Sequence, residues 1–253
     1  MSKPEKEHII EAFHFEIGKV KDKKIRQAVV DMFNNVDGDL AVEIAKGVGV
    51  SAPAQKGGSP VAKESPNLSQ ERSERNVKNT IKTRKIAILV ADGYDHKDLS
   101  QAMQALEAGG AKADIISKFQ GMLKSSDGQE IEVDKNYRTT ESVLYDAVYI
   151  PGGKENVETL KKHGGDAIHF VNEAFRHCKP LGATGEGVEL FKAAHLPDIK
   201  LAGKSSADKV VSDKGGVVTA RNEGDRSSFN ESFTIAIAQH RHWNREKKEQ
   251  VPA

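Results

Sequence analysis

One short segment constrains this chain more than any other, because residues 179–191 read as a buried strand, a glycine-dense corner and a helix. This is the layout of a nucleophile elbow, a sharp turn that presents an attacking side chain at the edge of a sheet. The apex, where such a turn would carry Cys or Ser, is Gly185. The segment therefore predicts an α/β fold with an enzyme-like corner that has no nucleophile.

Charge and composition exclude several classes of protein. The 38 basic and 37 acidic residues nearly cancel, so no strong field directs the chain to nucleic acid or to an anionic membrane. The longest apolar runs, such as 86–91, are too short to span a bilayer. The single Cys178 excludes an intramolecular disulfide and a cysteine-rich metal site. We expect a soluble protein and see no targeting signal, which leaves its compartment open.

The chain divides into zones of different composition. Residues 1–50 carry apolar positions at helical spacing, with breaks that suggest two or three short helices whose apolar stripes are too small to close a core alone. Residues 51–83 are rich in Pro, Gly, Ser and mixed charge, which is typical of a flexible linker. Residues 84–244 form the main domain, and 245–253 form a tail.

The main domain alternates strands with helices. Buried strands are expected at 86–91, 147–150 and 181–184, a further strand at 113–117, and two short strands at 210–211 and 217–219. Helices are expected at 99–108, 167–177, 188–194 and 229–243, and a hairpin at 119–133. This order favours a doubly wound parallel sheet with helices on both faces.

Three landmarks, at 86–93, 149–153 and 180–187, resemble the class I glutamine amidotransferase-like superfamily in its PfpI-type branch. The resemblance implies a flavodoxin-like sheet in which the Pro-Gly-Gly loop helps form an oxyanion hole. Asp98 matches the position of that branch's catalytic Glu, Gly185 that of its Cys, and Glu186 a position where a His or small residue commonly follows. Since two of these three positions are altered, we expect no catalytic residue here, only vestigial site positions.

A second resemblance covers nearly the whole chain. Residues 4–20, 25–32 and 37–41 look like the last helices of the haem catalase core. Residues 80–93 and 240–243 are similar to the start and the end of the extra C-terminal domain of large-subunit catalases. The resemblance implies a parent that decomposes hydrogen peroxide as a tetramer, with the rest of that subunit as a partner. The haem-ligating barrel is not part of this sequence, so we expect no haem and no peroxide turnover here.

Other candidate residues have competing interpretations. The turn at Gly152 and Gly153 precedes a helix, so its N–H groups are a possible anion site, or the glycines serve only the tight turn. We interpret Cys178 as structural, because it lies before the elbow strand. The remaining polar candidates are expected to be packing, surface or loop residues and not metal ligands: His195 with Asp198, His240 with His242, and Ser205, Ser206 and Asp208.

Two classes of function follow. The first is a non-enzymatic domain that stabilises its catalase and binds unfolding client proteins as a holdase, without ATP, since no phosphate-binding P-loop occurs. A purely structural, oligomer-stabilising domain is a variant of it. The second is a divergent hydrolase or glyoxalase that uses Asp98, Glu186 or Thr184 at the elbow, for which the sequence identifies no general base.

Overall fold

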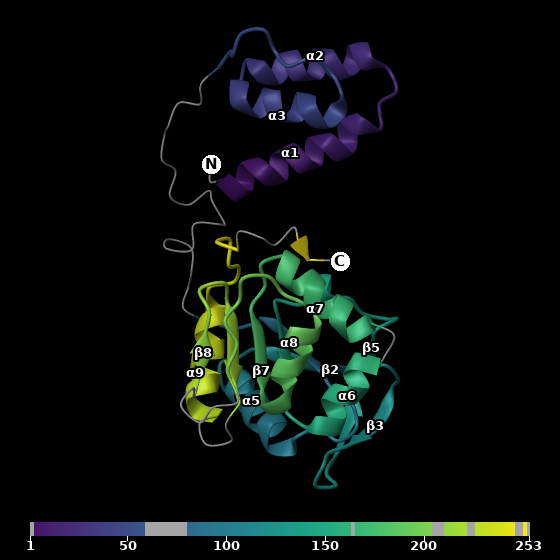
Figure 1. Cartoon of the computed structure of the whole chain (residues 1–253), viewed down its shortest axis with the longest axis vertical. Coiled ribbons are helices and arrows are strands. Elements are labelled where there is room, and N and C mark those ends of the chain that lie inside the picture. The colour runs from purple at the N-terminus through teal and green to yellow at the C-terminus, as the bar shows by residue number, and fades with distance from the viewer. Residues whose placement is uncertain are drawn as a thin grey trace. The chain divides into compact units, whose positions relative to one another are not determined.

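The structure is a computed structural model that describes residues 3–58, 80–162, 165–203, 210–221, 226–245 and 250–251. The chain forms two compact units, Met1–Asn76 and Val77–Ala253 (Figure 1). Among the described residues, no helix has the length and apolar character needed to cross a membrane.

The described residues of the first unit form three helices, α1 (Lys3–Gly18), α2 (Lys23–Asn34) and α3 (Gly38–Val48). Asp22 and Asp37 cap the second and third, each accepting hydrogen bonds from backbone N–H groups of the first turn. The expectation that these helices cannot close a core is wrong, because α2 and α3 bury a small cluster against which α1 packs. Its members are Val30, Leu40, Ala41, Ile44, Ala45 and Val48.

The second unit is built on a seven-stranded sheet in the order β5-β2-β1-β6-β7-β9-β8. All neighbours pair in parallel except β8 and β9. The strands are β1 (Lys85–Leu89), β2 (Lys112–Ser117), β5 (Lys135–Asn136), β6 (Ala147–Ile150), β7 (Leu181–Thr184), β8 (Val211–Ser212) and β9 (Val217–Ala220). The expected hairpin forms a separate pair, β3 (Gly121–Lys124) and β4 (Glu130–Val133). The predicted doubly wound, flavodoxin-like sheet is confirmed.

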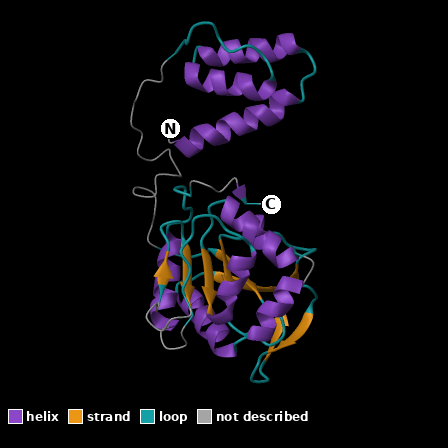
Figure 2. Ribbon diagram, in the orientation of Figure 1, coloured by secondary structure: helices purple, strands orange, loops and turns teal. Residues whose placement is uncertain are grey.

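Helices cover both faces of this sheet (Figure 2). One face carries α6 (Lys154–Lys162), α7 (Asp166–Arg176) and α8 (Val188–Ala193), and the other carries α5 (His96–Ala108) and α9 (Arg226–Ala238). Two short 3₁₀ turns, η1 (Ser142–Leu144) and η2 (Gly185–Gly187), precede β6 and α8. The last helix, α9, ends at Ala238, which is five residues before the end of the helix that the sequence pattern predicts at 229–243.

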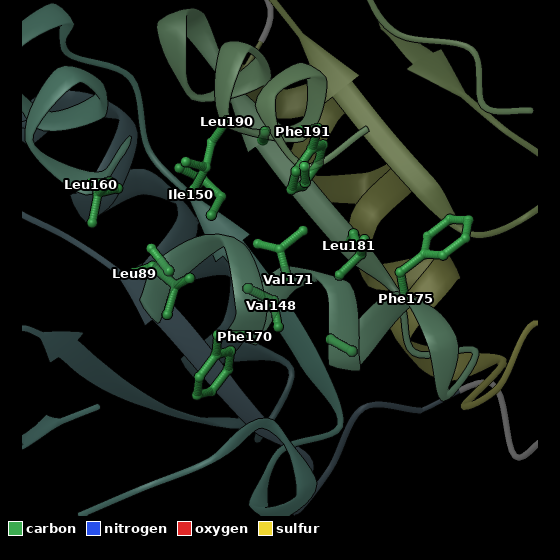
Figure 3. Close-up of a cluster of buried hydrophobic side chains, with 14 of the residues drawn as sticks. Leu89, Val148, Ile150, Leu160, Phe170, Val171, Phe175, Leu181, Leu190 and Phe191 are labelled. Carbon is green, nitrogen blue, oxygen red and sulfur yellow. The ribbon is translucent and has the colours of Figure 1, made fainter. Parts of the chain in front are cut away.

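Each face has its own apolar core. Figure 3 shows the face under α6, α7 and α8, where Leu89, Val148 and Ile150 of the sheet meet side chains of the helices. The opposite core stacks the rings of Tyr149, Phe229 and Phe233, whose centroids lie 5.7–6.0 Å apart. Strands buried on both faces explain the continuous apolar runs in the sequence.

The segment after α9 is anchored by Arg245. Its buried guanidinium donates to the carbonyls of Gly215 at 2.6 Å, Phe175 at 2.6 Å and Lys179 at 2.7 Å. Because Phe175 lies in the last turn of α7, this cation also satisfies carbonyls at a helix C-terminus. The boundary expected after residue 244 assigned Arg245 to the tail, whereas its side chain is part of the packed domain.

His242 is a packing residue of the same segment. Its ring lies against Gly216, whose φ of +76° and lack of a Cβ allow this close approach. The side chain is only 6% exposed, and Nε2 lies 3.1 Å from the carbonyl oxygen of Ala236. Burial, reinforced by the charge of Arg245, lowers the pKa of His242 from 6.5 to about 4.

This pKa predicts an acid-sensitive stability. The neutral imidazole is favoured in the folded state, so its contribution is fully present above pH 6.5 and is lost as the pH falls to about 4. The expected loss is about 3 kcal/mol of the free energy of unfolding. Urea denaturation at several pH values gives the free energy of unfolding as a function of pH. The His242→Gln variant should lack this part of the pH dependence.

The matched control is His195→Gln, which alters an exposed histidine of the same domain. It should leave the pH dependence unchanged. An identical pH slope in the wild-type chain and the His242→Gln variant would contradict the prediction.

Candidate functional site

The elbow predicted from the sequence is present. β7 ends at Thr184, and the chain turns through Gly185, at a φ of +52°, into η2 and α8. A Cβ at Gly185 would lie 3.2 Å from the Cα of Gly152 and 3.6 Å from Oδ2 of Asp98. The turn thus has the left-handed backbone of a nucleophile elbow, and its apex lies against the two landmarks expected beside it.

Asp98 is buried at the start of α5, where its backbone N–H donates to the capping carboxylate of Asp95 at 2.9 Å. One of its carboxylate oxygens accepts from Nε of Arg226, the first residue of α9. The other accepts from the N–H of Gly152 at 3.2 Å. Burial raises the pKa of the Asp98 carboxyl, and the positive charge of Arg226 opposes that rise.

Arg226 was not foreseen from the sequence. It lies 128 residues from Asp98, and both side chains are almost completely buried. No local pattern marks it, since only the packing of α9 beside α5 brings the two groups together. In the described structure, the Asp98 carboxylate is therefore one half of a buried ion pair.

Thr184 is also part of a buried polar network. Its hydroxyl lies 2.7 Å from the Tyr149 hydroxyl, which donates to the backbone carbonyl of Asp98 at 3.3 Å. Burial raises the pKa of Tyr149 well above its usual range, so the phenol stays protonated. Thr184 has no exposed surface, which removes it from contact with a substrate.

The Pro-Gly-Gly turn binds the chain's own carboxylates. The N–H of Gly152 donates to Asp98, and the N–H of Gly153 donates to Oε2 of Glu186 at 3.0 Å. Gly153 itself has a φ of +111°, and a Cβ there would collide with the carbonyl of Gly93. The glycines thus serve the tight turn, and the donors considered as an anion site already have anionic partners.

The crevice beyond β1 and β6 is crossed by further hydrogen bonds. In doubly wound sheets this is the topological switch point where ligands usually bind. The N–H of Asp95 donates to Gly152 at 2.9 Å, and Asn156 bridges Ala91 to the carbonyls of Pro151 and Gly152 at 2.7–3.2 Å. Direct hydrogen bonds thus join the loops that follow β1 and β6 at this switch point.

A cavity of about 440 Å³ lies beside the elbow, with Gly185 and Glu186 in its wall. Its charged groups are of both signs and are largely paired: Lys161 lies 3.0 Å from Glu158, and Arg221 contacts Glu189. Glu186 is exposed at this surface. Among its described lining residues, the cavity presents charged side chains and no Cys, Ser or Thr.

The remaining sequence candidates lie elsewhere. Cys178 is buried just after α7, at a φ of +58°, and not on the elbow. His195 and Asp198 lie in the loop that follows α8, both at positive φ. His240 lies 3.6 Å from Asp146, whereas His242 contacts Ala236, so the two imidazoles have different partners. Ser205, Ser206 and Asp208 lie outside the described residues.

Metal binding has no support in the described part of the chain. No three His, Cys, Asp or Glu side chains come together there as ligands.

Solved structures show the fold class. The chain resembles a ThiJ/PfpI domain protein from Brachyspira murdochii with a TM-score of 0.56 and 20% identity, over 62% of this chain and 97% of that one. It also resembles oxidized DJ-1 from Toxoplasma gondii with a TM-score of 0.53 and 17% identity, over 62% of this chain and 95% of that one. At these identities the likeness concerns the fold alone.

Sequence comparisons are more specific. Residues 82–247 match the family model of the C-terminal domain found in long catalases, and residues 1–48 match that of the catalase-related immune-responsive family. The chain is 43% identical to Catalase-2 of Bacillus subtilis over 97% of its own length and 32% of that protein. It is 40% identical to Catalase HPII of Mycobacterium avium over 100% of its own length and 35% of that protein.

The chain therefore spans about a third of the length of these curated relatives. From the match over residues 82–247, it belongs to the long catalases and corresponds to their C-terminal region.

Proposed function

We propose that the α/β domain has no chemistry of its own and stabilises a long catalase subunit within its tetramer, with a second role as an ATP-independent holdase for unfolding clients. The observation that carries the proposal is the elbow, where Gly185 replaces the nucleophile and both turn N–H groups bind the chain's own carboxylates. Peroxide decomposition and the haem belong, in this proposal, to the rest of the parent subunit.

The polar cluster at the elbow supports a structural role. Asp98 links α5 to α9 through Arg226 and to the loop after β6 through Gly152. Tyr149 and Thr184 extend the cluster to β6 and β7. A catalytic group must reach a substrate, whereas these groups are buried and bonded to each other. Their arrangement joins the layers of the domain at one point.

Exposed apolar side chains support the holdase role, because a holdase covers apolar patches of its client. Phe119 is 72% exposed and Met122 is 57% exposed, and both lie at the start of the β3–β4 hairpin. The helical unit also exposes Phe15 and Met32. Burying such groups contributes roughly 25 cal/mol per Å² of apolar area removed from water.

A divergent hydrolase or glyoxalase is the second candidate. It would need Thr184, Asp98 or Glu186 to act as the nucleophile or base. Thr184 is enclosed by Tyr149, and Asp98 is bound by Arg226. Only Glu186 is exposed. No observation in the described residues favours this candidate over the first.

The first prediction is that the elbow is chemically silent. Glyoxalase, esterase and peptidase assays of the purified chain should stay at background, and Glu186→Gln should not change them. Gly185→Cys alone should also give little activity. Distance is not the reason, because Oδ2 of Asp98 lies 3.6 Å from the Cβ position of residue 185. The reasons are that Arg226 binds Asp98 and that the positive φ at residue 185 strains any side chain there.

The informative comparison is Gly185→Cys with and without Arg226→Gln, each tested for thiol alkylation rate and for turnover. Family-like turnover in the single variant, or turnover in the wild-type chain that Glu186→Gln abolishes, would overturn the prediction.

The second prediction concerns the ion pair. Arg226→Met leaves a buried carboxylate without its cation, so the free energy of unfolding should fall by about 3–5 kcal/mol. Asp98→Asn should be destabilising for the reciprocal reason. The double variant should recover much of the loss, because both charges are then absent. Urea denaturation of the four proteins measures this coupling.

Lys161→Met is the matched control, because it breaks a more exposed pair with Glu158 and should cost less than about 1 kcal/mol. Strictly additive losses at Asp98 and Arg226 would show that the pair does not join α5 to α9.

The third prediction is suppression of aggregation. The chain should reduce light scattering from a heat-stressed unrelated enzyme without ATP, whereas serum albumin at the same concentration should not. If the hairpin is the binding surface, Phe119→Glu with Met122→Lys should lose most of the protection without changing the net charge. If the helical unit is the binding surface, Phe15→Glu with Met32→Lys should lose most of the protection.

Lys118→Gln with Glu132→Gln is the control for the hairpin, since it alters two exposed polar neighbours and also leaves the net charge unchanged. No protection by the wild-type chain at molar excess would leave only the structural role.

A further inference from the structure

The hairpin of β3 and β4 has an open edge. It forms a separate two-stranded antiparallel sheet at one side of the second unit (Figure 1). Just beyond β4 the chain bonds to the main sheet, where the N–H of Asp134 donates to the carbonyl of Ile115 at 3.0 Å. Since β4 lies on the side of the main sheet, the outer edge of the hairpin is that of β3.

The hydrogen bonds of Lys124 show which backbone atoms of β3 point outward. Its N–H donates to Oδ1 of Asp92 at 2.8 Å, and its carbonyl accepts from the N–H of Gly93 at 2.7 Å. The next residue, Ser125, instead donates its N–H across the hairpin to Gln129 at 2.8 Å. Because these directions alternate along an antiparallel strand, every second residue back from Lys124 also points away from β4.

Met122 lies at such an outward position. Within the described part of the chain, its N–H and carbonyl make no hydrogen bond beyond the hairpin. The residue is 57% exposed, and a Cβ at the neighbouring Gly121 would meet no atom within 4 Å. The loop of residues 92–94 covers the edge at Lys124 and Ser125. A donor and an acceptor on an exposed strand edge form a template for another extended chain.

Apolar side chains accompany this edge. The side chain of Met122 lies on the outer face of the hairpin, and the largely exposed Phe119 lies two residues before β3. On the inner face, Leu123 and Ile131 pack against the core under α5 and α9. Alternate side chains of a strand share one face, so a strand added beside Met122 gains apolar contacts as well as backbone hydrogen bonds.

The charges beside the edge distinguish between two occupants. Lys118 and Lys124 lie on either side of Met122, and both are exposed. If two copies of this edge paired antiparallel with Met122 opposite Gln120, each Lys118 would lie opposite a Lys124. Like charges at opposite positions are destabilising, and lysines are a common means of blocking edge-to-edge pairing. The charges therefore favour an apolar segment of another polypeptide over a second copy of this chain.

We propose that the open edge of β3 binds an extended apolar segment of an unfolded polypeptide as an added β-strand. The N–H and carbonyl of Met122 form hydrogen bonds with the backbone of that segment, and the side chains of Met122 and Phe119 contact its apolar residues. The inference rests on the proposed holdase role and names how a client is bound.

The test is an NMR titration of the ¹⁵N-labelled full chain with a blocked hexapeptide that alternates valine and threonine. Saturable shifts are expected at residues 121–124. Two further peptides carry N-methyl groups, one on its valines and the other on its threonines, so each keeps its side chains and lacks alternate N–H donors. At least one of them should bind about fivefold more weakly, because the donors that face β3 belong to one of the two sets.

A pair of variants tests the same contact from the side of the chain. Met122→Pro removes the outward N–H without removing a hydrogen bond to β4, and proline is tolerated at such edge positions. It should weaken binding of the unmodified peptide about fivefold. Met122→Leu is the matched comparison, because it keeps the N–H and an apolar side chain. The N-methylated peptides are tested on the wild-type chain, so their result does not depend on the folding of a variant.

Four outcomes would overturn the proposal. They are the absence of saturable shifts at residues 121–124, equal affinity of the three peptides, equal affinity of folded Met122→Pro and Met122→Leu variants, and a wild-type dimer that Met122→Pro dissociates, which would assign the edge to a second copy.

The aggregation assay separates this proposal from the holdase role. Protection that Met122→Pro leaves intact would remove the edge of β3 as the client site while the holdase role stands. Peptide binding at the edge without any protection would have the opposite meaning, since the edge would then bind extended segments in a chain that is not a holdase.

Discussion

The arrangement at the elbow depends on one constraint, which is that the carboxylate of Asp98 lies where water cannot solvate it. An isolated carboxylate at such a position is very unfavourable, so the fold must supply a cation and hydrogen-bond donors. Arg226 and the N–H of Gly152 supply them. Because Arg226 opens α9 and Gly152 follows β6, satisfying one side chain fixes the position of a helix and of a loop.

This constraint also bears on the hydrogen-bond donors of the turn, which are bonded within the chain. The donors that stabilise charge in an enzyme must be vacant until the transition state forms. Here Gly152 and Gly153 donate to carboxylates of the same chain, and the hydroxyls of Tyr149 and Thr184 bind each other. The turn has the backbone shape of a nucleophile elbow, and its hydrogen-bonding capacity is used within the protein.

Sequence reasoning succeeded where local patterns carry the information. The continuous apolar runs of strands that are buried on both faces predicted β1 and β6, and the glycines after β7 predicted the elbow with Gly185 at its apex. It failed where a contact joins distant segments. Nothing near Arg226 indicates a carboxylate partner 128 residues away, and nothing near Arg245 shows that its guanidinium ends among three carbonyls. The helical unit was expected to need another partner because its apolar stripes, taken together, looked too small for a core, whereas most of the buried cluster comes from the single helix α3.

The exposed carboxylate of Glu186, bonded to the N–H of Gly153, has a consequence for the evolutionary history open to this domain. Regaining a thiol at residue 185 does not by itself restore an oxyanion-binding position, because Glu186 already occupies one of the donors. A working enzyme would also need Asp98 released from Arg226, a step that weakens the fold before any activity appears to compensate for it. A cysteine at residue 185 would therefore need two further changes, at Glu186 and at Arg226, before this turn could bind an oxyanion.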